Sequence, residues 1–493
     1  MSLSAQLLLT LALATPLLHA VLVFLFPRPP GLRDVIHIGF SAVLAGACFA
    51  IANAVSHGQH ARIIVARPLP HVDLAFSIEP LGALTAVAIA GLGLAHAVHT
   101  SGMARAEQEA NPHRLMALLA LSYAMAIAAA FSANLFTFFV AAQALAVATF
   151  PLAAHGVDDE ARARARAYLA PLLIASAGLL LPAMVWTYAR AGTLDFRAGG
   201  MLAGHVDQIS ANVLVVLFVF GIASAALPPL HRWLTNSSGA GYSALVVIQA
   251  TAVLPVGILG LIKISAYVLG PVLHDQQGHL ILAARGLVVL AAVSMCVAAL
   301  MALSKQDMRE RLAYSVLAQS MAAALGALLA LPQGLFAAAL QLVALMCASA
   351  TLMMAAGAAY AATGRRDAAQ YAGLGRLMPW TFAAFALGAA SLIGMPPFSG
   401  AWAKLWLITA SADAGAPWAA ALVGLAAILT FAHLGPLTAS AVASPAPADA
   451  FKRADGASIM LVAPVVVCGA ATLLLLVMAN PIFLFLQPLW NGP

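Results

Sequence analysis

Residues 378–412 read MPWTFAAFALGAASLIGMPPFSGAWAKLWLITASA, a long apolar run that two prolines and two flanking glycines interrupt near its middle. The run has the length of a membrane-spanning helix, yet proline removes a backbone donor and breaks a helix. Broken backbone at membrane depth is tolerated only where it is buried in protein or lines a water-filled cavity. The run therefore predicts an interrupted membrane helix within a larger bundle, with Lys404 just after the break.

A second interruption, at Pro228 and Pro229, lies in or at the end of another apolar segment, five expected helices before Pro396 and Pro397. Many transporters contain two repeats of inverted topology whose discontinuous helices meet near the middle of the bilayer. We therefore expect two inverted five-helix repeats, made of helices four to eight and nine to thirteen, with helices seven and twelve broken.

Composition places the whole chain in a membrane. Of its 493 residues, 63% are hydrophobic and only 8% are charged, whereas a soluble domain has roughly 25% charged residues. We predict an all-α polytopic membrane protein of about 14 helices, because apolar runs of about 20 residues recur along the sequence. The expected spans are residues 3–27, 34–55, 80–100, 114–132, 134–155, 166–189, 209–230, 241–269, 280–303, 310–331, 334–362, 378–412, 416–443 and 457–485.

Short connections between these spans predict a single transmembrane domain over residues 1–493. Residues 1–113 would form the first three helices, residues 114–270 the first repeat, residues 279–443 the second and residues 457–485 the last helix. The first segment is expected to be retained, because residues 1–6 carry no Lys or Arg and no small-residue cleavage site follows.

The positive charges predict the orientation, because Lys and Arg of short loops are held on the cytoplasmic side during insertion. Even-numbered connections hold only Arg62, Arg67, Arg190 and Arg197. We therefore expect the odd-numbered connections in the cytoplasm and both termini on the outer, periplasmic face of a bacterial-type cytoplasmic (inner) membrane. The net charge of +6 then reflects topology, and no nucleic-acid partner is expected. The odd-numbered connections hold sixteen positive residues: Arg28, Arg33, Arg105, Arg114, Arg162, Arg164, Arg166, Arg232, Lys305, Arg309, Arg311, Arg365, Arg366, Arg376, Lys452 and Arg453.

Charged residues inside the apolar segments are few, and all 17 carboxylates fall in expected loops or at helix ends. Lys263 and Arg285, near segment ends, are interpreted as anchors whose long side chains reach the headgroups. Lys404 has two interpretations, a helix-end lysine that reaches water or a buried cation on an ion path beside exposed backbone carbonyls.

Neutral polar side chains in the apolar segments could also carry protons with the help of water, although hydrogen bonding between helices explains most of them equally well. His19, His96 and His433 are expected to pack against polar backbone or to lie near an interface, because they lack partners at helical spacing. The four cysteines are expected to be small buried apolar groups. No metal site and no cofactor are expected. The neutral candidates are Gln143, Ser224, Gln249, Thr251, Ser315, Gln319, Gln341 and Ser349.

Taken together, several short motifs resemble the antiporter-like membrane subunits shared by Mrp cation/proton antiporters, especially their D-type branch, respiratory complex I and membrane-bound hydrogenases. The resemblance runs from about Val72 to about Pro436 and depends on the order and spacing of the motifs. These are Ser77-Ile78-Glu79-Pro80-Leu81-Gly82, Leu230-His231-Arg232-Trp233-Leu234, Arg311-Leu312-Ala313-Tyr314-Ser315 with Gln319, Ala362-Thr363-Gly364-Arg365-Arg366-Asp367, and Met378-Pro379-Trp380-Thr381 leading to Gly394-Met395-Pro396-Pro397-Phe398-Ser399-Gly400 and Lys404.

The resemblance implies fourteen core helices, two inverted repeats and a central polar axis of lysines, a histidine and a glutamate. This sequence departs from that axis at most positions. The glutamate of the fifth helix falls on Gln143 and the lysine of the seventh on Ser224; only the lysine of the twelfth helix is kept, as Lys404. A gapless alignment from His231 puts the remaining histidine and lysine positions on Gln249, Pro255, Leu345 and Ser349.

The sequence thus favours an antiporter-like subunit of a multisubunit assembly that has a structural role or provides a partial proton path. One alternative is an active cation/proton transporter that uses Lys404 and water chains, with Gln143, Gln249, Gln319 and His231 as further candidates for the ion path. Another is an energy-coupling partner of a soluble catalytic protein, of bicarbonate-uptake or hydrogenase type. No catalytic centre is expected, because no loop carries a nucleotide-binding or nucleophile motif. Expected partners are paralogous and small membrane subunits, the lipid bilayer and, in the last alternative, a soluble cytoplasmic protein.

Overall fold

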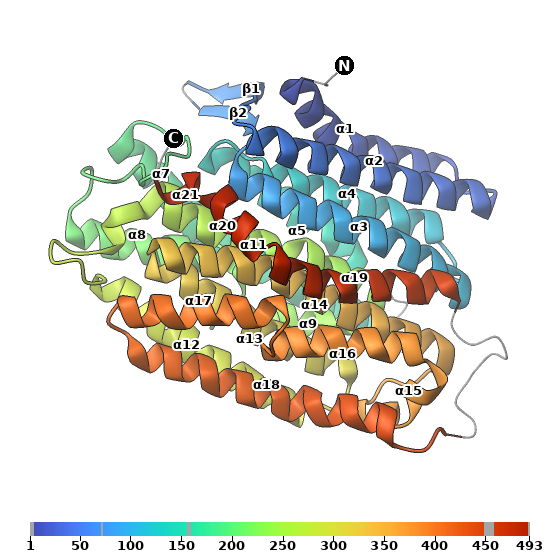
Figure 1. Ribbon diagram of the computed structural model, residues 1–493. Coiled ribbons are helices and arrows are strands. Elements are labelled where there is room, and N and C mark those ends of the chain that lie inside the picture. The colour runs from blue at the N-terminus through green and yellow to red at the C-terminus, as the bar shows by residue number, and fades with distance from the viewer. Residues whose placement is uncertain (1–3, 71, 155–158, 448–457, 492–493) are drawn as a thin grey trace.

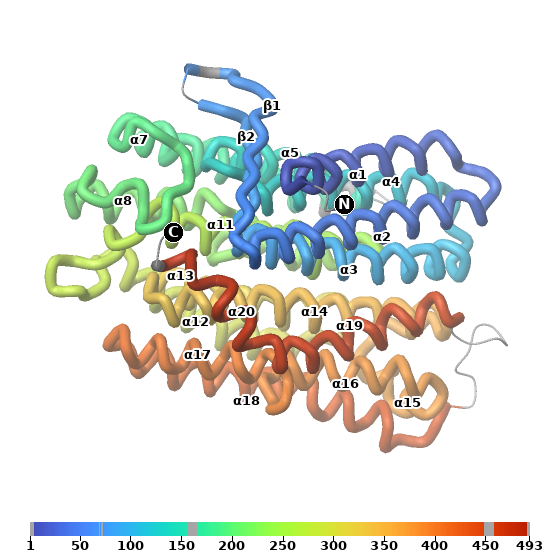
Figure 2. Tube along the Cα trace, turned by 45° about the horizontal axis from the view of Figure 1, so that its top comes forward, coloured from blue at the N-terminus to red at the C-terminus, as the bar shows by residue number. Residues whose placement is uncertain are grey.

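The computed structural model describes residues 4–70, 72–154, 159–447 and 458–491. Long helices lie side by side, with α1 to α5 on one side of the bundle, α16 to α18 on the other, and α11, α13 and α14 between them (Figures 1 and 2). The chain begins and ends toward the end of the bundle that carries a β-hairpin, which we call the hairpin end. Which membrane face this end meets stays a prediction.

The first helices are long and mostly uninterrupted. A π-helical segment, Ser176–Leu180, joins α6 to α7. Of the odd-loop charges, Lys452 and Arg453 and the side chains of Arg162 and Arg164 lie outside the described residues. The elements of this part are α1 (Ala5–Leu25), α2 (Pro30–Ser56), β1 (Arg62–Leu69), β2 (Val72–Ser77), α3 (Pro80–Ala106), α4 (Pro112–Ala130), α5 (Leu135–Ala153), α6 (Asp159–Ala175) and α7 (Leu181–Ala191).

The middle of the chain contains the first break and several π-helical or 3₁₀ stretches near it. The segment from Tyr242 to Leu273 is buried along its length and alternates between α- and π-helix. In chain order, the elements before this segment are α8 (Gln208–Gly221), the 3₁₀ turn Ala223–Ala225, α9 (Arg232–Asn236) and the 3₁₀ turn Ser237–Gly239. The segment itself consists of α10 (Tyr242–Leu245), the π-helical Val246–Thr251, α11 (Val253–Lys263), the π-helical Ile264–Leu269 and the 3₁₀ turn Gly270–Leu273.

The last part of the chain contains the second break and the C-terminal helices. Its elements are α12 (Leu282–Ser304), α13 (Met308–Leu329), α14 (Pro332–Thr363), the 3₁₀ turn Ala368–Tyr371, α15 (Leu374–Leu377), α16 (Pro379–Ile393), α17 (Ser399–Asp413), α18 (Pro417–Ala443), α19 (Ile459–Val477), α20 (Ala479–Leu486) and α21 (Pro488–Asn491).

The helical architecture expected from hydropathy is confirmed. Within the described residues, 12 segments are long and apolar enough to cross a membrane, and two shorter apolar helices, α8 and α16, precede the breaks. Both breaks fall where the prolines predicted them: α8 ends at Gly221 before Pro228 and Pro229, and α16 ends at Ile393 before Pro396 and Pro397. The number of membrane crossings and the inverted repeats remain predictions.

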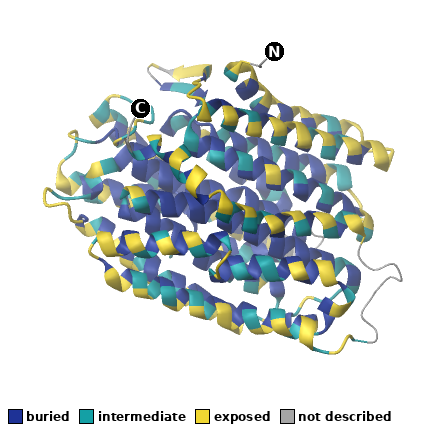
Figure 3. Cartoon of the chain, in the orientation of Figure 1, coloured by how far each residue is buried: buried dark blue, intermediate teal, exposed yellow. Residues whose placement is uncertain are grey.

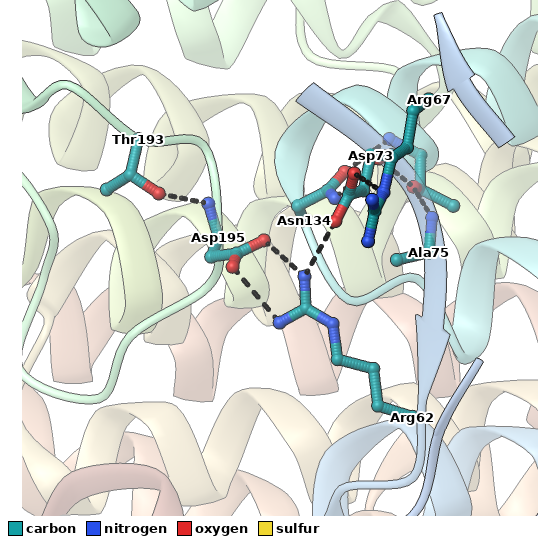
Figure 4. Close-up of polar contacts among 8 residues, drawn as sticks. Arg62, Arg67, Asp73, Ala75, Asn134, Thr193 and Asp195 are labelled. Carbon is teal, nitrogen blue, oxygen red and sulfur yellow. Dashed lines mark hydrogen bonds and ion pairs between the residues drawn. The ribbon is translucent and has the colours of Figure 1, made fainter. Parts of the chain in front are cut away.

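The hairpin of β1 and β2 adds a small sheet that the hydropathy pattern does not predict. The strands pair antiparallel, with Arg62 opposite Ser77. The backbone around residue 131 extends the pairing, because Ser77 N donates to Phe131 O at 2.8 Å. Arg62 forms a two-pronged ion pair with Asp195 at 3.0 Å (Figure 4). The hairpin is thereby tied to the loop that follows α7.

Most buried residues lie in the middle of the bundle, and exposed residues lie mostly along the outer helices (Figure 3). The segments of α13 and α14 that would cross a membrane are almost wholly buried, whereas only about a third of each such segment of α1, α2 and α18 is buried. Exposed apolar side chains such as Phe49, Ile428 and Phe431 are expected of helices that face lipid or a neighbouring subunit.

Candidate functional site

Lys404 lies inside the protein at the second break. Its side chain is buried, and Nζ donates to the Leu392 carbonyl at 2.7 Å. Leu392 is in the last turn of α16, where backbone carbonyls have no partner within the helix. No described carboxylate lies within ion-pairing distance of Lys404. Lys404 is therefore a buried lysine whose amino group binds the end of a helix, which contradicts the interpretation as a helix-end lysine that reaches water. That it lies on an ion path stays a prediction.

Close backbone packing shapes this break. Gly394 has a φ of +88°, a left-handed conformation that suits glycine at a helix end. Gly400, in the first turn of α17, lies against the end of α16 so closely that an added Cβ would stand 1.8 Å from Ser391 O. Gly394 lets the aliphatic part of Lys404 pass the end of α16, because an added Cβ there would stand 2.7 Å from Lys404 Cδ, and Gly400 lets α17 begin close against α16.

A groove of about 470 Å³ opens beside Lys404. Its walls are apolar and come from the second break, from α17 and α18, and from Leu476 of α19. Pro396 and Pro397 line it, and so does Trp402. Lys404 thus stands between a helix end and a recess on the outer surface of the bundle.

Gln143 and Ser224 line one small cavity of about 20 Å³. The Gln143 amide also donates to the Ser176 hydroxyl in the π-helical segment before α7. These are the positions at which the family resemblance implied a glutamate and a lysine. A cavity of this size holds about one water molecule, and its polar lining is neutral.

Gln249 and His231 lie near the first break but make different contacts. Gln249 is fully buried, and its amide donates to Ser237 Oγ at 2.8 Å and to Leu234 O at 3.1 Å. His231 is half-buried, and its Nδ1 has no partner among the described residues. Gln249 therefore braces the short helices that follow the break.

Gln319 and Ser349 lie on the central helices α13 and α14. Gln341 of α14 donates to Gln319 Oε1 at 3.1 Å, which joins the two helices. Ser349 instead donates to Leu345 O of its own helix at 2.5 Å. These hydrogen bonds do not reach Lys404. Among the described residues, the seven ion-path candidates therefore do not form one connected hydrogen-bond network; they are Lys404, Gln143, Ser224, His231, Gln249, Gln319 and Ser349.

At the first break, other side chains bind the backbone carbonyls that the interrupted helix leaves free. Trp233 Nε1 donates to Ala223 O at 2.7 Å, and Ser320 of α13 donates to Ala225 O at 2.9 Å. Both acceptors belong to the turn just after α8. The carbonyls freed here are thus satisfied by neutral donors, whereas the second break uses a cation.

The structure corrects the interpretation of Lys263 as an anchor in the headgroups. Lys263 is only 1% exposed, and its Nζ lies 3.2 Å from Glu79 Oε1. It also donates to Ala130 O at 3.0 Å, to Ser132 O at 3.1 Å and to Ser132 Oγ at 3.3 Å. Tyr267 completes the set by donating to Glu79 Oε2 at 2.7 Å. Arg285, by contrast, is exposed as expected.

Glu79 has a second role as the cap of α3, where its carboxylate accepts from Leu81 N at 3.0 Å and Gly82 N at 2.8 Å. A carboxylate at a helix N-terminus satisfies free backbone donors and meets the positive end of the helix dipole. Sequence reasoning placed Glu79 correctly at a helix end but gave no sign of its partner.

The interpretation of the histidines also needs correction, because each contacts another side chain. His19 Nε2 lies 3.0 Å from His37 Nδ1, His96 Nδ1 lies 3.0 Å from the Tyr123 hydroxyl, and His433 Nε2 lies 3.2 Å from Ser315 Oγ. Near the start of α2, buried Asp34 accepts from both Arg33 and Arg105. The described residues contain no group of three potential metal ligands.

Comparisons with known proteins agree with the resemblance. The N-type subunit of the NADH-quinone oxidoreductase of Desulforudis audaxviator is 27% identical over 409 residues, or 81% of this chain and 79% of that protein. The D-type subunit of the Na(+)/H(+) antiporter of Alkalihalophilus pseudofirmus is 26% identical over 281 residues, or 56% of this chain and 55% of that protein.

Solved structures share the fold. A chain of the Mrp complex from Dietzia sp. superposes with a TM-score of 0.86 at 24% identity, over 100% of this chain and 98% of that one. A chain of respiratory complex I from Thermus thermophilus superposes with a TM-score of 0.82 at 20% identity, over 98% of both chains.

A family model supplies the assignment. Residues 132–430, more than half of the chain, match the model described as NADH:quinone oxidoreductase/Mrp antiporter, TM. The matched range contains both breaks and Lys404. This chain therefore belongs to the NADH:quinone oxidoreductase/Mrp antiporter family of membrane subunits.

Proposed function

We propose that this chain is a subunit of a multisubunit, Mrp-like or complex I-like membrane assembly, in which it provides architecture and a partial proton path instead of a complete channel. The observation that carries the proposal is the cavity shared by Gln143 and Ser224. A glutamate and a lysine are implied there by the family resemblance. This chain has an amide and a hydroxyl in their place.

Neutral groups in this cavity can bind water but cannot hold a charge for transfer. A charge on its way through the membrane interior needs a counter-charge or a titratable group, because an unpaired ion there costs several kcal/mol. The Gln143 amide is already bonded to Ser176. The cavity of about 20 Å³ leaves room for about one water molecule, which is too little for a continuous water chain.

Lys404 is the one member of the implied axis that remains, and it supports the partial path. Its amino group donates to the neutral Leu392 carbonyl. No described carboxylate lies close enough to accept a proton from it. The groove beside it gives an opening of about 470 Å³ toward the outer surface. A proton path through Lys404 would need the acid, or the water, of a neighbouring subunit.

The first test is purification in a mild detergent, followed by mass-spectrometric identification of every chain that stays bound. The proposal expects paralogous antiporter-like subunits and small membrane subunits in constant proportion. A chain that purifies alone contradicts it. A large soluble protein in their place would support the alternative of an energy-coupling partner.

The second test compares proton and sodium flux in proteoliposomes that hold the wild-type assembly, Lys404→Ala or the control Lys305→Ala. Lys305 is a partly exposed lysine that pairs with Glu310 at 3.4 Å, so its loss should leave flux unchanged. A partial path predicts reduced flux of the assembly with Lys404→Ala. Sodium or proton transport by the isolated chain, abolished in Lys404→Ala, would favour the active transporter instead.

A further inference from the structure

A groove of about 540 Å³ runs along the outer surface between α1 and α4, which lie side by side in Figure 2. Five residues of α1, from Leu17 to Leu25, line the groove, and so do four residues of α4, from Arg114 to Leu121. The chain begins at the hairpin end, and these residues belong to the second half of α1 and the first half of α4. The groove therefore lies toward the end of the bundle opposite the hairpin.

Packing near the groove fixes the end of α1 against the start of α4. Val23 of α1, Ala104 of α3 and Met116 of α4 form a small buried apolar cluster. The ring centroids of Phe24 and His113 lie 6.0 Å apart. The two helices that form the groove are thus fixed relative to each other, so the groove is a built feature of the fold.

The residues that line the groove are apolar except for Arg114. Leu17, Phe24 and Leu25 are exposed in the described chain. Along α1 the groove extends over eight residue steps, or about 12 Å. Membrane helices tilt on average by only about 20° from the bilayer normal, so a groove along two of them matches the direction of an extended acyl chain.

Arg114 lies at the end of the groove where a lipid headgroup is expected. It belongs to the first turn of α4, and the ends of a 19-residue apolar helix lie at the level of the headgroups. The side chain is exposed, and its guanidinium forms no ion pair with another described residue. Arg28 follows Leu25 by three residues, so it lies within about 11 Å of the groove. Two positive charges thus mark this end of the groove.

Two carboxylates that the chain places near this end bind other groups. Buried Asp34, at the start of α2, accepts from Arg33 and Arg105. Glu109, just before α4, accepts from Asn111 N at 3.2 Å. Neither carboxylate lines the groove. A counter-ion inside the groove would therefore have to come from a bound molecule.

We propose that this groove binds an anionic phospholipid, with the phosphate group on Arg114 and one acyl chain along α1 and α4. Arginine is suited to this contact, because its planar fork can donate two parallel hydrogen bonds to a phosphate. The acyl chain is flexible, so it can follow an irregular apolar recess. The inference does not depend on the proposed function, because it requires only that the chain spans a membrane.

A helix of a neighbouring subunit fits the groove less well. A helical segment about 12 Å long and about 10 Å wide occupies about 900 Å³, which is more than the groove provides. Such a helix would also cover the Arg114 guanidinium, and covering a charge without giving it a partner is unfavourable. A phospholipid brings the phosphate together with the chain, so it matches both the charged end and the apolar length of the groove.

A second groove, of about 770 Å³, provides an internal control. It lies between the end of α2, the start of α3, and the C-terminal helices α20 and α21. Phe49 and Leu484 are among its apolar residues, and its polar residues, Asn53 and Ser56, are neutral. This control groove offers no charge to a phosphate, so we expect it to take lipid without a preference for an anionic headgroup.

The test measures how phospholipids with brominated acyl chains quench the fluorescence of a tryptophan placed in each groove. Val21→Trp reports on the groove between α1 and α4, and Leu484→Trp reports on the control groove; both replaced side chains are exposed. The full chain, with any partners that stay bound, is reconstituted in vesicles whose brominated component is either phosphatidylglycerol or phosphatidylcholine. The signal of the seven native tryptophans is subtracted with the unsubstituted protein.

One arginine near a membrane surface favours an anionic lipid about fivefold. We therefore expect quenching in Val21→Trp to need about fivefold less phosphatidylglycerol than phosphatidylcholine, and no such difference in Leu484→Trp. Adding Arg114→Gln should remove the preference, while Arg114→Lys should keep most of it, because lysine also binds phosphate. Arg232→Gln is the control, because Arg232 is an exposed arginine outside the groove, and it should leave the preference unchanged.

Equal quenching by the two lipids in Val21→Trp would overturn the inference, and so would a preference that survives Arg114→Gln. If Arg114→Gln fails to fold, the salt dependence decides, because the preference in Val21→Trp has to fall when the salt concentration is raised to about 1 M. A preference that stays constant with salt would overturn the inference. Absence of quenching by either lipid would mean that another subunit covers the groove, and this result would overturn it as well.

Discussion

Replacing Glu79 with glutamine removes the charge that faces the Lys263 ammonium group and keeps the shape of the side chain. Glutamine keeps only one of the two acceptor oxygens, so it can still cap Leu81 or Gly82 but not both, because these two amides bond different oxygens of Glu79. The ion pair is therefore separated from the helix cap by comparison with Lys263→Met and the double variant.

The magnitude follows from the distance and the surroundings. At the observed 3.2 Å, two unit charges attract by about 5 kcal/mol at an effective dielectric constant of about 20. The Glu79 side chain is 20% exposed, so water weakens this attraction. Lys263 also keeps three backbone and hydroxyl oxygens from Ala130 and Ser132. We therefore expect a loss of about 2–3 kcal/mol, less than the 3–5 kcal/mol that breaking a fully buried pair costs.

The assay is reversible unfolding in mixed micelles of a mild detergent and sodium dodecyl sulfate, for wild type, Glu79→Gln, Lys263→Met and the double variant. If the pair forms, the loss of unfolding free energy in the double variant should be smaller than the sum of the two single losses, by at least about 1.5 kcal/mol. Arg67→Gln is the control, because its ion pair with Asp73 is exposed and contributes at most about 1 kcal/mol. Strictly additive losses, or a Glu79→Gln loss below about 0.5 kcal/mol, would refute the reasoning.

Three further predictions use the same unfolding assay. Gln143→Glu should lower the unfolding free energy by about 2–3 kcal/mol, because none of the described residues that line its cavity is a cation; an unchanged value would mean that water or a hidden cation reaches it. Gly400→Ala should lower the unfolding free energy by about 3 kcal/mol or more, because the new Cβ would stand 1.8 Å from the Ser391 carbonyl oxygen. Gly424→Ala is the control and should leave the unfolding free energy nearly unchanged, because Gly424 has open space around it. Partial burial raises the pKa of Asp307, but hydrogen bonds and charge from Arg309 outweigh it and hold that pKa below its usual value. The stability that Asp307 contributes is then present above a pH of about 4 and lost below it, so the difference from Asp307→Asn should shrink between pH 7 and pH 3; a constant difference would contradict the assignment.

Hydropathy and proline chemistry predicted the helical architecture and both breaks, because these features depend on residues that are neighbours in the sequence. A membrane helix is recognised from about 20 consecutive residues, and Pro396 acts on the helix it interrupts. The position of Lys404 beside a helix end followed for the same reason. The hairpin of β1 and β2 was missed, since two short strands with exposed residues give a weak pattern beside long apolar runs.

Contacts between distant parts of the chain could not be predicted from local patterns. Nothing in the spacing of Glu79 and Lys263 indicates that α3 and α11 bring them together, and the same holds for His19 and His37, which lie on neighbouring helices. A lysine near the end of an apolar segment is consistent with both an anchor and a buried pair. The distinction depends on which helices pack together, and one sequence without relatives does not contain that information.

The two buried lysines share a mode of stabilisation that bears on the fate of the polar axis. Lys263 donates to Ala130, the last residue of α4, and Lys404 donates to Leu392 in the last turn of α16. The C-terminal end of a helix carries partial negative charge and unpaired carbonyls, so it stabilises a cation without an acid. At the first break, however, the carbonyls of Ala223 and Ala225 already accept from Trp233 and Ser320. A lysine at the position of Ser224, in this same turn, would therefore need a carboxylate partner, so loss of the acid at the position of Gln143 is expected to go with loss of that lysine.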